Sequence, residues 1–254
     1  MQKKMKQEVQ DLLRRGIIRP STSPYSASIS MVEKKDRTIR ICSAPIGLNA
    51  ATIDDGQPLP NMRELMDAIA GAKYYSSWDL ISGFWQIEIE EGDKAKTAFS
   101  TSWGHYEYNV MPFGLKGAPV TFQRLMTKVL GLYLYDFVMV YLDDIIIFSQ
   151  TMDKHLQHMR KVLEALRQAG LKLKLEKCEF AKKQLKYLGF IIGEFEIKPN
   201  LEKVRAIADQ LIPTNQTQIR SFLGMIRFFR NHIQGFLTIT GPMTNLLTKE
   251  VPYV

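Results

Sequence analysis

Two adjacent carboxylates stand inside an otherwise apolar stretch, VMVYLDDIIIFSQ, which covers residues 138–150. Asp143 and Asp144 have aliphatic, aromatic or β-branched neighbours on both sides, so the stretch predicts a strand, a turn and a second strand that enter a core. Two carboxylates at the tip of a buried hairpin would repel each other unless a cation lay between them. Mg²⁺ is such a cation, because it takes oxygen ligands and is usually held by one or two carboxylates.

A third acid is expected from elsewhere in the chain. Asp79, in YYSSWDLISGFW, ends an apolar strand of its own and precedes a bend at Ser82 and Gly83. It lies 64 positions before Asp143 (143 minus 79), which is enough chain to return to a neighbouring strand. Three aspartates on adjacent strand ends can hold two metal ions about 4 Å apart, which stabilise the attacking and leaving oxygens of an in-line phosphoryl transfer. The pattern predicts nucleotidyl transfer.

The plainer interpretation of Asp143 and Asp144 is a two-residue turn, where Asp is common. A second acidic pair, Asp54 and Asp55, fits that interpretation, because Gly56 and two prolines follow it and predict a loop. The apolar strands around Asp143 and Asp144 favour a site instead.

The composition favours a globular protein with a polyanionic partner. The 254 residues are 45% hydrophobic and 24% charged, and the formal net charge is +8. Residues 151–200 hold eleven Lys and Arg against six Asp and Glu, a net of +5 (11 minus 6). Such a basic segment is typical of polyanion binding, with a solvated lysine surface as the alternative.

Other kinds of site are not indicated. Cys42 and Cys178 are far apart and form no CxxC pattern, so neither a disulfide framework nor a zinc site is expected. His155 and His158 are expected to lie on the solvated face of an amphipathic helix rather than to bind a metal. No apolar run approaches the roughly 18 residues of a membrane span, so a soluble chain without a membrane partner is expected.

The elements that must position the acids mix strands and helices without a regular βαβ period, which predicts an α+β fold. The expected elements are a helix over residues 4–15, a hairpin over 27–44, a helix from Asn61 to Ala70, a strand ending near Asp79 with a second strand-like segment after the bend, an amphipathic helix after Gly117, a helix closed by Gly170, and helices beyond residue 199, one of them capped by Thr214 or Thr217.

Six segments, in this order and spacing, resemble the reverse transcriptases of retroviruses and LTR retrotransposons, in particular those of the Gypsy class. They are EVQDLLRRGIIRPSTSPYSASISMVEKKD, SSWDLISGFWQI, FSTSWGHYEYNVMPFGLKGAPVTFQRLM, YLDD, LKYLGFIIG and SFLGMIRFFRNHI. The resemblance implies a right-hand polymerase whose antiparallel palm sheet carries the YLDD hairpin. Its expected parts are fingers at 1–55 and 87–116, palm at 56–86 and 117–195, and thumb with the start of a connection at 196–254.

The resemblance also implies roles for individual residues. Asp79, Asp143 and Asp144 would be the catalytic metal ligands, with the backbone carbonyl of Leu80 at the nucleotide-bearing metal. Phe84 matches an aromatic gate whose ring would clash with a ribose 2′-OH. Three further groups of residues match functional segments of the family. Lys34, Lys35 and Arg40 would bind the triphosphate, and Pro112, Phe113 and Gly114 would line the nucleotide pocket and the template strand. Leu188, Gly189 and Phe190 would position the primer 3′ end. Core packing is the alternative for Phe113 and Leu188.

One segment departs from the family pattern. Family members usually carry an Asp-Tyr-Arg type sequence before the LN of the fingers, where this chain has CSAPIGLN at 42–49. The acidic and basic pair expected to contact the template or brace the fingers is replaced there by Ala44, Pro45, Ile46 and Gly47, so the departure concerns template binding and not the metal site.

The resemblance implies an RNA-directed DNA polymerase that extends a primer 3′-OH with dNTPs by two-metal nucleotidyl transfer. Two Mg²⁺ ions, with Mn²⁺ as a substitute, are the implied cofactors. The implied partners are an RNA or DNA template, a DNA or tRNA primer, and the RNase H and integrase regions of a polyprotein, with no RNase H domain among these residues. The implied location is cytoplasmic, within virus-like particles.

Two alternatives remain at this stage. An RNA-dependent RNA polymerase shares paired aspartates, but Phe84 argues against it, because a ribonucleotide needs room for its 2′-OH. A catalytically impaired, retroelement-derived nucleic-acid-binding protein would use the basic segment and the helical C-terminal third to bind a duplex backbone. Mg²⁺-dependent primer extension separates the last alternative from a polymerase.

Overall fold

The computed structural model describes residues 2–33, 39–57 and 60–248 of the chain. Its helices are α1 (Gln2–Arg14), α2 (Ile46–Ala51), α3 (Met62–Ile69), α4 (Glu91–Lys94), α5 (Ala118–Leu130), α6 (Met152–Gln168), α7 (Leu201–Ala208), α8 (Gln216–Arg227) and α9 (Phe236–Asn245), with short 3-10 helices that include η1 (Gly83–Gln86) and η4 (Leu175–Lys177). Its strands are β1 (Ile18–Pro20), β2 (Ser28–Glu33), β3 (Ile39–Ala44), β4 (Tyr74–Asp79), β5 (Phe99–Thr101), β6 (Gly104–Tyr108), β7 (Val138–Tyr141), β8 (Asp144–Ser149), β9 (Glu179–Lys182), β10 (Gln184–Tyr187), β11 (Phe190–Gly193) and β12 (Ile197–Pro199).

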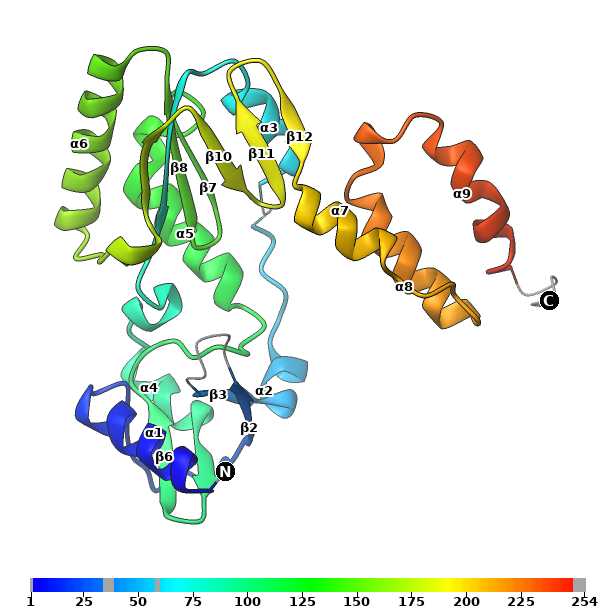
Figure 1. Cartoon of the computed structure of the whole chain (residues 1–254). Coiled ribbons are helices and arrows are strands. Elements are labelled where there is room, and N and C mark those ends of the chain that lie inside the picture. Colours follow the sequence, from blue (N-terminus) through cyan, green and yellow to red (C-terminus); the bar gives the residue numbers. More distant parts are fainter. Residues whose placement is uncertain (1, 34–38, 58–59, 249–254) are drawn as a thin grey trace.

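The elements form three regions (Figure 1). A central region, at the upper left of the view, holds a four-stranded antiparallel sheet of order β7-β8-β4-β9. A lower region holds α1, the β2-β3 hairpin and the β1-β6-β5 sheet, and helices α7 to α9 extend to the right. Strands and helices intermix as the sequence predicts, and the expected α+β class is confirmed.

The central sheet is covered on both faces, which explains the unbroken apolar run in its hairpin. Ile145 and Ile147 pack in one core with side chains of α5 and α6. Ile146 and Phe148 pack in a second core with side chains of α3 and the β10-β11 hairpin. Successive residues of a strand point to opposite faces, so a strand between two cores needs apolar residues at every position. The aspartates at the end of this strand are therefore the exception to its apolar composition.

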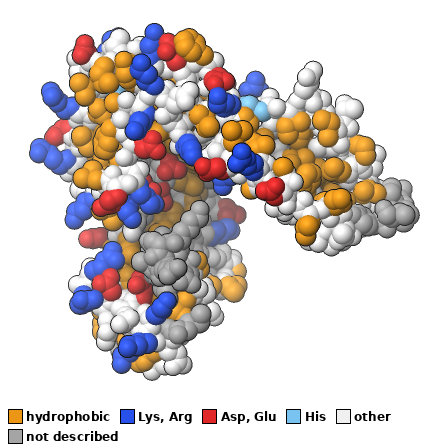
Figure 2. All heavy atoms as spheres, in the orientation of Figure 1, with side chains coloured by type: hydrophobic (Ala, Val, Ile, Leu, Met, Phe, Trp, Pro, Cys, Tyr) orange, Lys and Arg blue, Asp and Glu red, His pale blue; other side chains and the backbone are white. Residues whose placement is uncertain are grey.

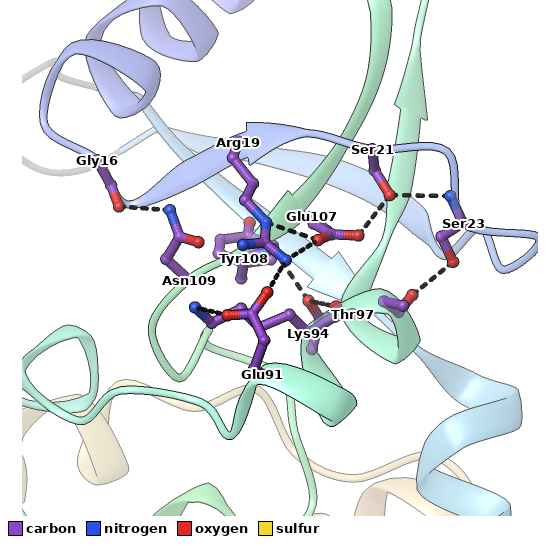
Figure 3. A network of polar contacts seen from close by, with 11 residues as sticks. Gly16, Arg19, Ser21, Ser23, Glu91, Lys94, Thr97, Glu107, Tyr108 and Asn109 are labelled. Carbon is purple, nitrogen blue, oxygen red and sulfur yellow. Dashed lines mark hydrogen bonds and ion pairs between the residues drawn. The ribbon is translucent and has the colours of Figure 1, made fainter.

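A polar network stabilises the lower region (Figure 3). Glu107 on β6 is only 6% exposed, and its carboxylate accepts hydrogen bonds from Arg19 at 2.7 Å and from Ser21. Arg19 also pairs with Glu91 of α4. Burial by itself raises the pKa of Glu107, but the hydrogen bonds from Ser21 and Arg19 outweigh it, and the pKa lies below its usual value. The network ties β1, β6 and α4 together as a paired and hydrogen-bonded cluster, the arrangement in which a buried charge is tolerated.

The helical region carries large apolar side chains on its surface (Figure 2). Leu201 is 64% exposed, Leu237 is 82% exposed and Leu211 is 91% exposed. Among the described residues, no helix has the length and apolar character that crossing a bilayer requires.

Most expected elements are present, and two details were wrong. The helix expected from Asn61 to Ala70 is α3, with the Asn61 side chain accepting the hydrogen bond from the N–H of Arg63. The strand expected after the bend is only an isolated bridge between Glu88 and Val110, because α4 begins at once. The cap of α8 is Asn215 and neither expected threonine.

Candidate active site

Three aspartates meet at one end of the central sheet. Strands β4 and β8 are antiparallel, and their register places Asp79 directly opposite Asp144. Strands β7 and β8 pair Tyr141 with Asp144, so Leu142 and Asp143 alone form the connecting turn. The 64 intervening positions thus return the chain to the neighbouring strand, as the sequence predicts.

The turn that carries Asp143 is held from two sides. Leu142 has a φ of 55°, in the left-handed region, and its N–H donates to Oε1 of Gln123 on α5 at 3.0 Å. On the other side, a Cβ placed on Gly83 would lie 2.6 Å from Oδ1 of Asp143, so only glycine allows this approach. Sequence reasoning identified neither supporting role. The available signal for Gln123 was an amide on the apolar face of an amphipathic helix.

A lysine that the sequence did not single out faces the acids. Nζ of Lys177, in η4, lies 3.0 Å from Oδ2 of Asp79. Burial raises the pKa of Asp144, the charge of Asp79 raises it further, and Lys177 opposes both effects. Two neighbouring carboxylates in a partly desolvated site favour a bound cation, and Lys177 supplies one positive charge in this arrangement.

The chemistry of these side chains fits a hard divalent cation. Carboxylate oxygens are the ligands that Mg²⁺ prefers. Within the described part of the chain, no three His, Cys, Asp or Glu side chains are gathered closely enough to hold a metal ion as they stand. The backbone brings the three aspartates to one edge of the sheet, where their carboxylates would supply the oxygen ligands of such an ion.

Comparison with known proteins decides the family. A family model described as Reverse transcriptase (RNA-dependent DNA polymerase) matches residues 32–192. The chain belongs to the reverse transcriptase family. It is 44% identical over 96% of its length to the retrovirus-related Pol polyprotein from transposon 297 of Drosophila melanogaster, and 36% identical over 97% to an enzymatic polyprotein of Cauliflower mosaic virus. It spans only 23% and 37% of those two polyproteins.

Solved structures establish the same fold. A foamy viral protease-reverse transcriptase in complex with double-stranded DNA superposes with a TM-score of 0.90 at 25% identity, covering 98% of this chain and 44% of that one. The same kind of protein with an RNA/DNA hybrid gives a TM-score of 0.85 at 25% identity, covering 98% of this chain and 33% of that one. The expected right-hand polymerase fold is confirmed, while the bounds of fingers, palm and thumb remain a prediction.

The residue expected to be the aromatic gate lies close to the turn that carries Asp143. Phe84 follows Gly83 in η1, and its ring centroid is 5.3 Å from that of Phe113 and 5.6 Å from that of Phe122. Sequence reasoning placed Phe84 and Phe113 in one pocket, and the structure brings their rings together. Leu80 lies directly after β4 and forms a bridge with Leu173.

The segment at 112–114 packs against the end of β3 and against α2. Pro112 is buried, and Gly114 has a φ of 102°. A side chain at Gly114 would collide with the carbonyl oxygen of Ser43. The side chain of Asn49 donates to the carbonyl of Gly114 at 2.8 Å and accepts from the N–H of Lys116 at 2.8 Å. The divergent CSAPIGLN segment therefore packs directly against this loop.

The expected primer-end segment forms the tip of the β10-β11 hairpin. Leu188 and Gly189 have φ values of 47° and 86°, as a tight two-residue turn requires. Phe190 is buried against the aromatic residues after α8, and its ring centroid is 5.4 Å from that of Phe229. Tyr187 donates a hydrogen bond of 3.3 Å to the backbone carbonyl of Asp144, so this hairpin contacts the site's own strand.

Three expected nucleotide contacts are not placed. Lys34 and Lys35 lie outside the described residues, and Arg40 is described only through its backbone, which pairs with Val32 in the β2-β3 hairpin. Their role in binding triphosphate stays a prediction.

The expectation that both histidines of α6 lie on a solvated face was wrong. His155 is fully buried, with Nε2 2.8 Å from Oγ of Ser76 and Nδ1 2.9 Å from Oγ of Ser149. His158 stacks on Phe137 with ring centroids 3.9 Å apart. These histidines attach α6 to the sheet. They lie on the face of the helix that is turned toward the hydroxyl groups of Ser76 in β4 and Ser149 in β8.

Proposed function

We propose that this chain is the polymerase part of a reverse transcriptase and extends a primer on an RNA or DNA template. One observation carries the proposal: in a chain of this family, Asp79 and Asp144 stand opposite each other with Asp143 in the adjoining turn. In the reaction, the primer 3′-oxygen bonds to the α-phosphorus of a dNTP. The bond from that phosphorus to the bridging oxygen breaks, and pyrophosphate leaves.

Asp79, Asp143 and Asp144 would hold the divalent cations, two Mg²⁺ or Mn²⁺ in their place. When bound, such ions lower the pKa of the attacking hydroxyl and neutralise charge that develops at phosphorus. The chain itself positions the carboxylates through the sheet register, and Nζ of Lys177 places a positive charge 3.0 Å from Oδ2 of Asp79.

Phe84 would select deoxynucleotides. Its ring is braced by Phe113 and Phe122 at 5.3 and 5.6 Å between centroids, so it forms a rigid wall. A rigid wall rejects an added hydroxyl sterically, whereas a soft apolar pocket discriminates weakly against such a group.

The proposed partners follow from the relatives. The foamy viral protein has been solved with double-stranded DNA and with an RNA/DNA hybrid, which supports a template-primer duplex here. Because the chain spans about a quarter of the Pol polyprotein from transposon 297, we propose RNase H and integrase regions as covalent neighbours. A tRNA or DNA primer and a cytoplasmic, virus-like particle location complete the proposal.

Primer extension tests the proposal directly. The 254-residue chain is given an RNA template, a DNA primer, Mg²⁺ and dNTPs, beside Asp143→Asn, Asp144→Asn and, as an exposed acidic control, Asp153→Asn. We expect extension by the parent and the control, and a loss of at least about 100-fold in the two site variants. Phe84→Ala should incorporate ribonucleotides more readily. A folded parent that extends no primer with Mg²⁺ or Mn²⁺ would overturn the proposal.

A further inference from the structure

A buried amide supports the turn that presents Asp143. Gln123 is 3% exposed, and its side chain makes two polar contacts with the hairpin. Its Oε1 accepts from the N–H of Leu142 at 3.0 Å, and its Nε2 donates to the carbonyl of Val140 at 3.4 Å. One side chain therefore binds the last part of β7 and the first residue of the turn.

The turn needs such support. Leu142 adopts a φ of 55°, and a leucine in the left-handed region is held there by its surroundings rather than by its own preference. Behind the hairpin lies a cavity of about 410 Å³, lined by Gln123 itself and by Thr127, Met139 and Val140 among others. The cavity leaves space beside Gln123, while Met139 and Val140 stay buried in the cores, and the amide is the polar contact that holds the N–H of Leu142.

The residue before Gln123 contacts the other half of the site. The ring of Phe122 would lie 3.0 Å from a Cβ at Gly83, and it packs edge-on against Phe84 at 5.6 Å between centroids. Adjacent helical residues point about 100° apart, so consecutive side chains of one rigid helix can reach both structures. Helix α5 thus touches the gate through Phe122 and the aspartate turn through Gln123.

We propose that Gln123 is a positioning residue that sets the turn carrying Asp143 at a fixed place relative to the gate residue Phe84. The proposal rests on the proposed polymerase function. It assigns the amide a role in the rate of the chemical step, beyond the stability that any satisfied buried amide contributes. A displacement of about 1 Å at a reacting group can cost about 100-fold in rate.

Two substitutions at this position separate the roles. Gln123→Met keeps the length of the side chain and removes both polar contacts. Gln123→Glu keeps an acceptor for the N–H of Leu142, and because burial beside the aspartates favours the neutral carboxyl, its O–H can still donate to the Val140 carbonyl. Thr127→Val is the matched control, because Thr127 lines the same cavity from the same helix and its hydroxyl donates to the carbonyl of Gln123 rather than to the turn.

Amide hydrogen exchange at Leu142 and steady-state primer extension are measured on each variant, with thermal unfolding as the check on folding. For Gln123→Met we expect lost protection at Leu142 and a kcat lower by about 10- to 100-fold, with the KM for dNTP within about threefold. Gln123→Glu should keep the protection and stay within about fivefold of the parental kcat, and Thr127→Val should match the parent.

The outcomes are decisive in each arm. A folded Gln123→Met chain with parental kcat, or a Thr127→Val chain with an equal loss, would overturn the proposal. If Gln123→Met does not fold, Gln123→Glu decides: parental protection and kcat support the role, and a large loss of kcat with protection intact contradicts it. A parent without extension activity is a failure of the proposed function instead, and exchange at Leu142 still tests the contact.

Discussion

Gly83 lets the backbone after β4 approach Asp143 more closely than a side chain would permit. In Gly83→Ala, the new methyl group would lie 2.6 Å from Oδ1 of Asp143 and 3.0 Å from the ring of Phe122. The carboxylate or the Phe122 ring must move, and we expect primer extension to fall by about 10- to 100-fold, measured as kcat on a fixed template-primer.

The control for this prediction is Gly92→Ala, because a Cβ there meets nothing within 4 Å. The control should keep parental kcat, and both variants should remain folded by thermal unfolding. An active Gly83→Ala chain would show that the carboxylate position at the turn is not critical.

At the scale of elements, α6 is attached to the sheet through a neutral imidazole. Burial lowers the pKa of His155 to about 4, and the neighbouring His158 lowers it further. The unfolded chain has a histidine pKa of about 6.5, so between these values only the unfolded chain takes up the proton. This contribution to stability is complete above about pH 6.5 and is lost as the pH falls toward 4.

We therefore expect the free energy of unfolding to drop by about 2 kcal/mol from this group between about pH 7.5 and pH 5. Urea unfolding at the two pH values measures it, with His155→Leu as the comparison. The variant should be less stable at the higher pH but should lose less on acidification. Equal losses in the two chains would contradict a neutral buried imidazole.

The loop at 112–114 contacts β3 so closely that position 114 has no room for a side chain. Gly114 combines a φ of 102° with a Cβ position occupied by the Ser43 carbonyl. We expect Gly114→Ala to lower the free energy of unfolding by about 1–3 kcal/mol in chemical denaturation. Gly47→Ala, where a Cβ meets nothing within 4 Å, should change it far less. A stable Gly114→Ala chain would show that this loop can move away from β3.

At the scale of the whole molecule, the net charge of +8 predicts how a duplex is bound. Contacts with phosphates release counterions, so the affinity for template-primer should fall steeply with salt, by about 1,000-fold between about 50 and 200 mM. Fluorescence anisotropy with duplexes of unrelated sequence should give similar slopes. Binding that is insensitive to salt would exclude phosphate contacts as its main source.

Local patterns were enough to predict much of the fold. The YLDD hairpin, α3 and the β2-β3 hairpin follow from alternation, caps and turn residues within a few positions of each other. The coming together of Asp79 with Asp143 and Asp144 could also be predicted, because each acid ends an apolar strand that requires a place inside a sheet.

The features that could not be predicted from the sequence depend on contacts between residues far apart in the chain. His155 looked solvated in the sequence, and only the approach of Ser76, 79 positions away, showed its burial. Lys177 is 98 positions from Asp79, and nothing near either residue indicated the pair. The residue types by themselves determined that this chain has an acidic site at a strand hairpin. Tertiary structure decided which amide, glycine and lysine surround it, because burial and pairing depend on neighbours that local sequence does not specify.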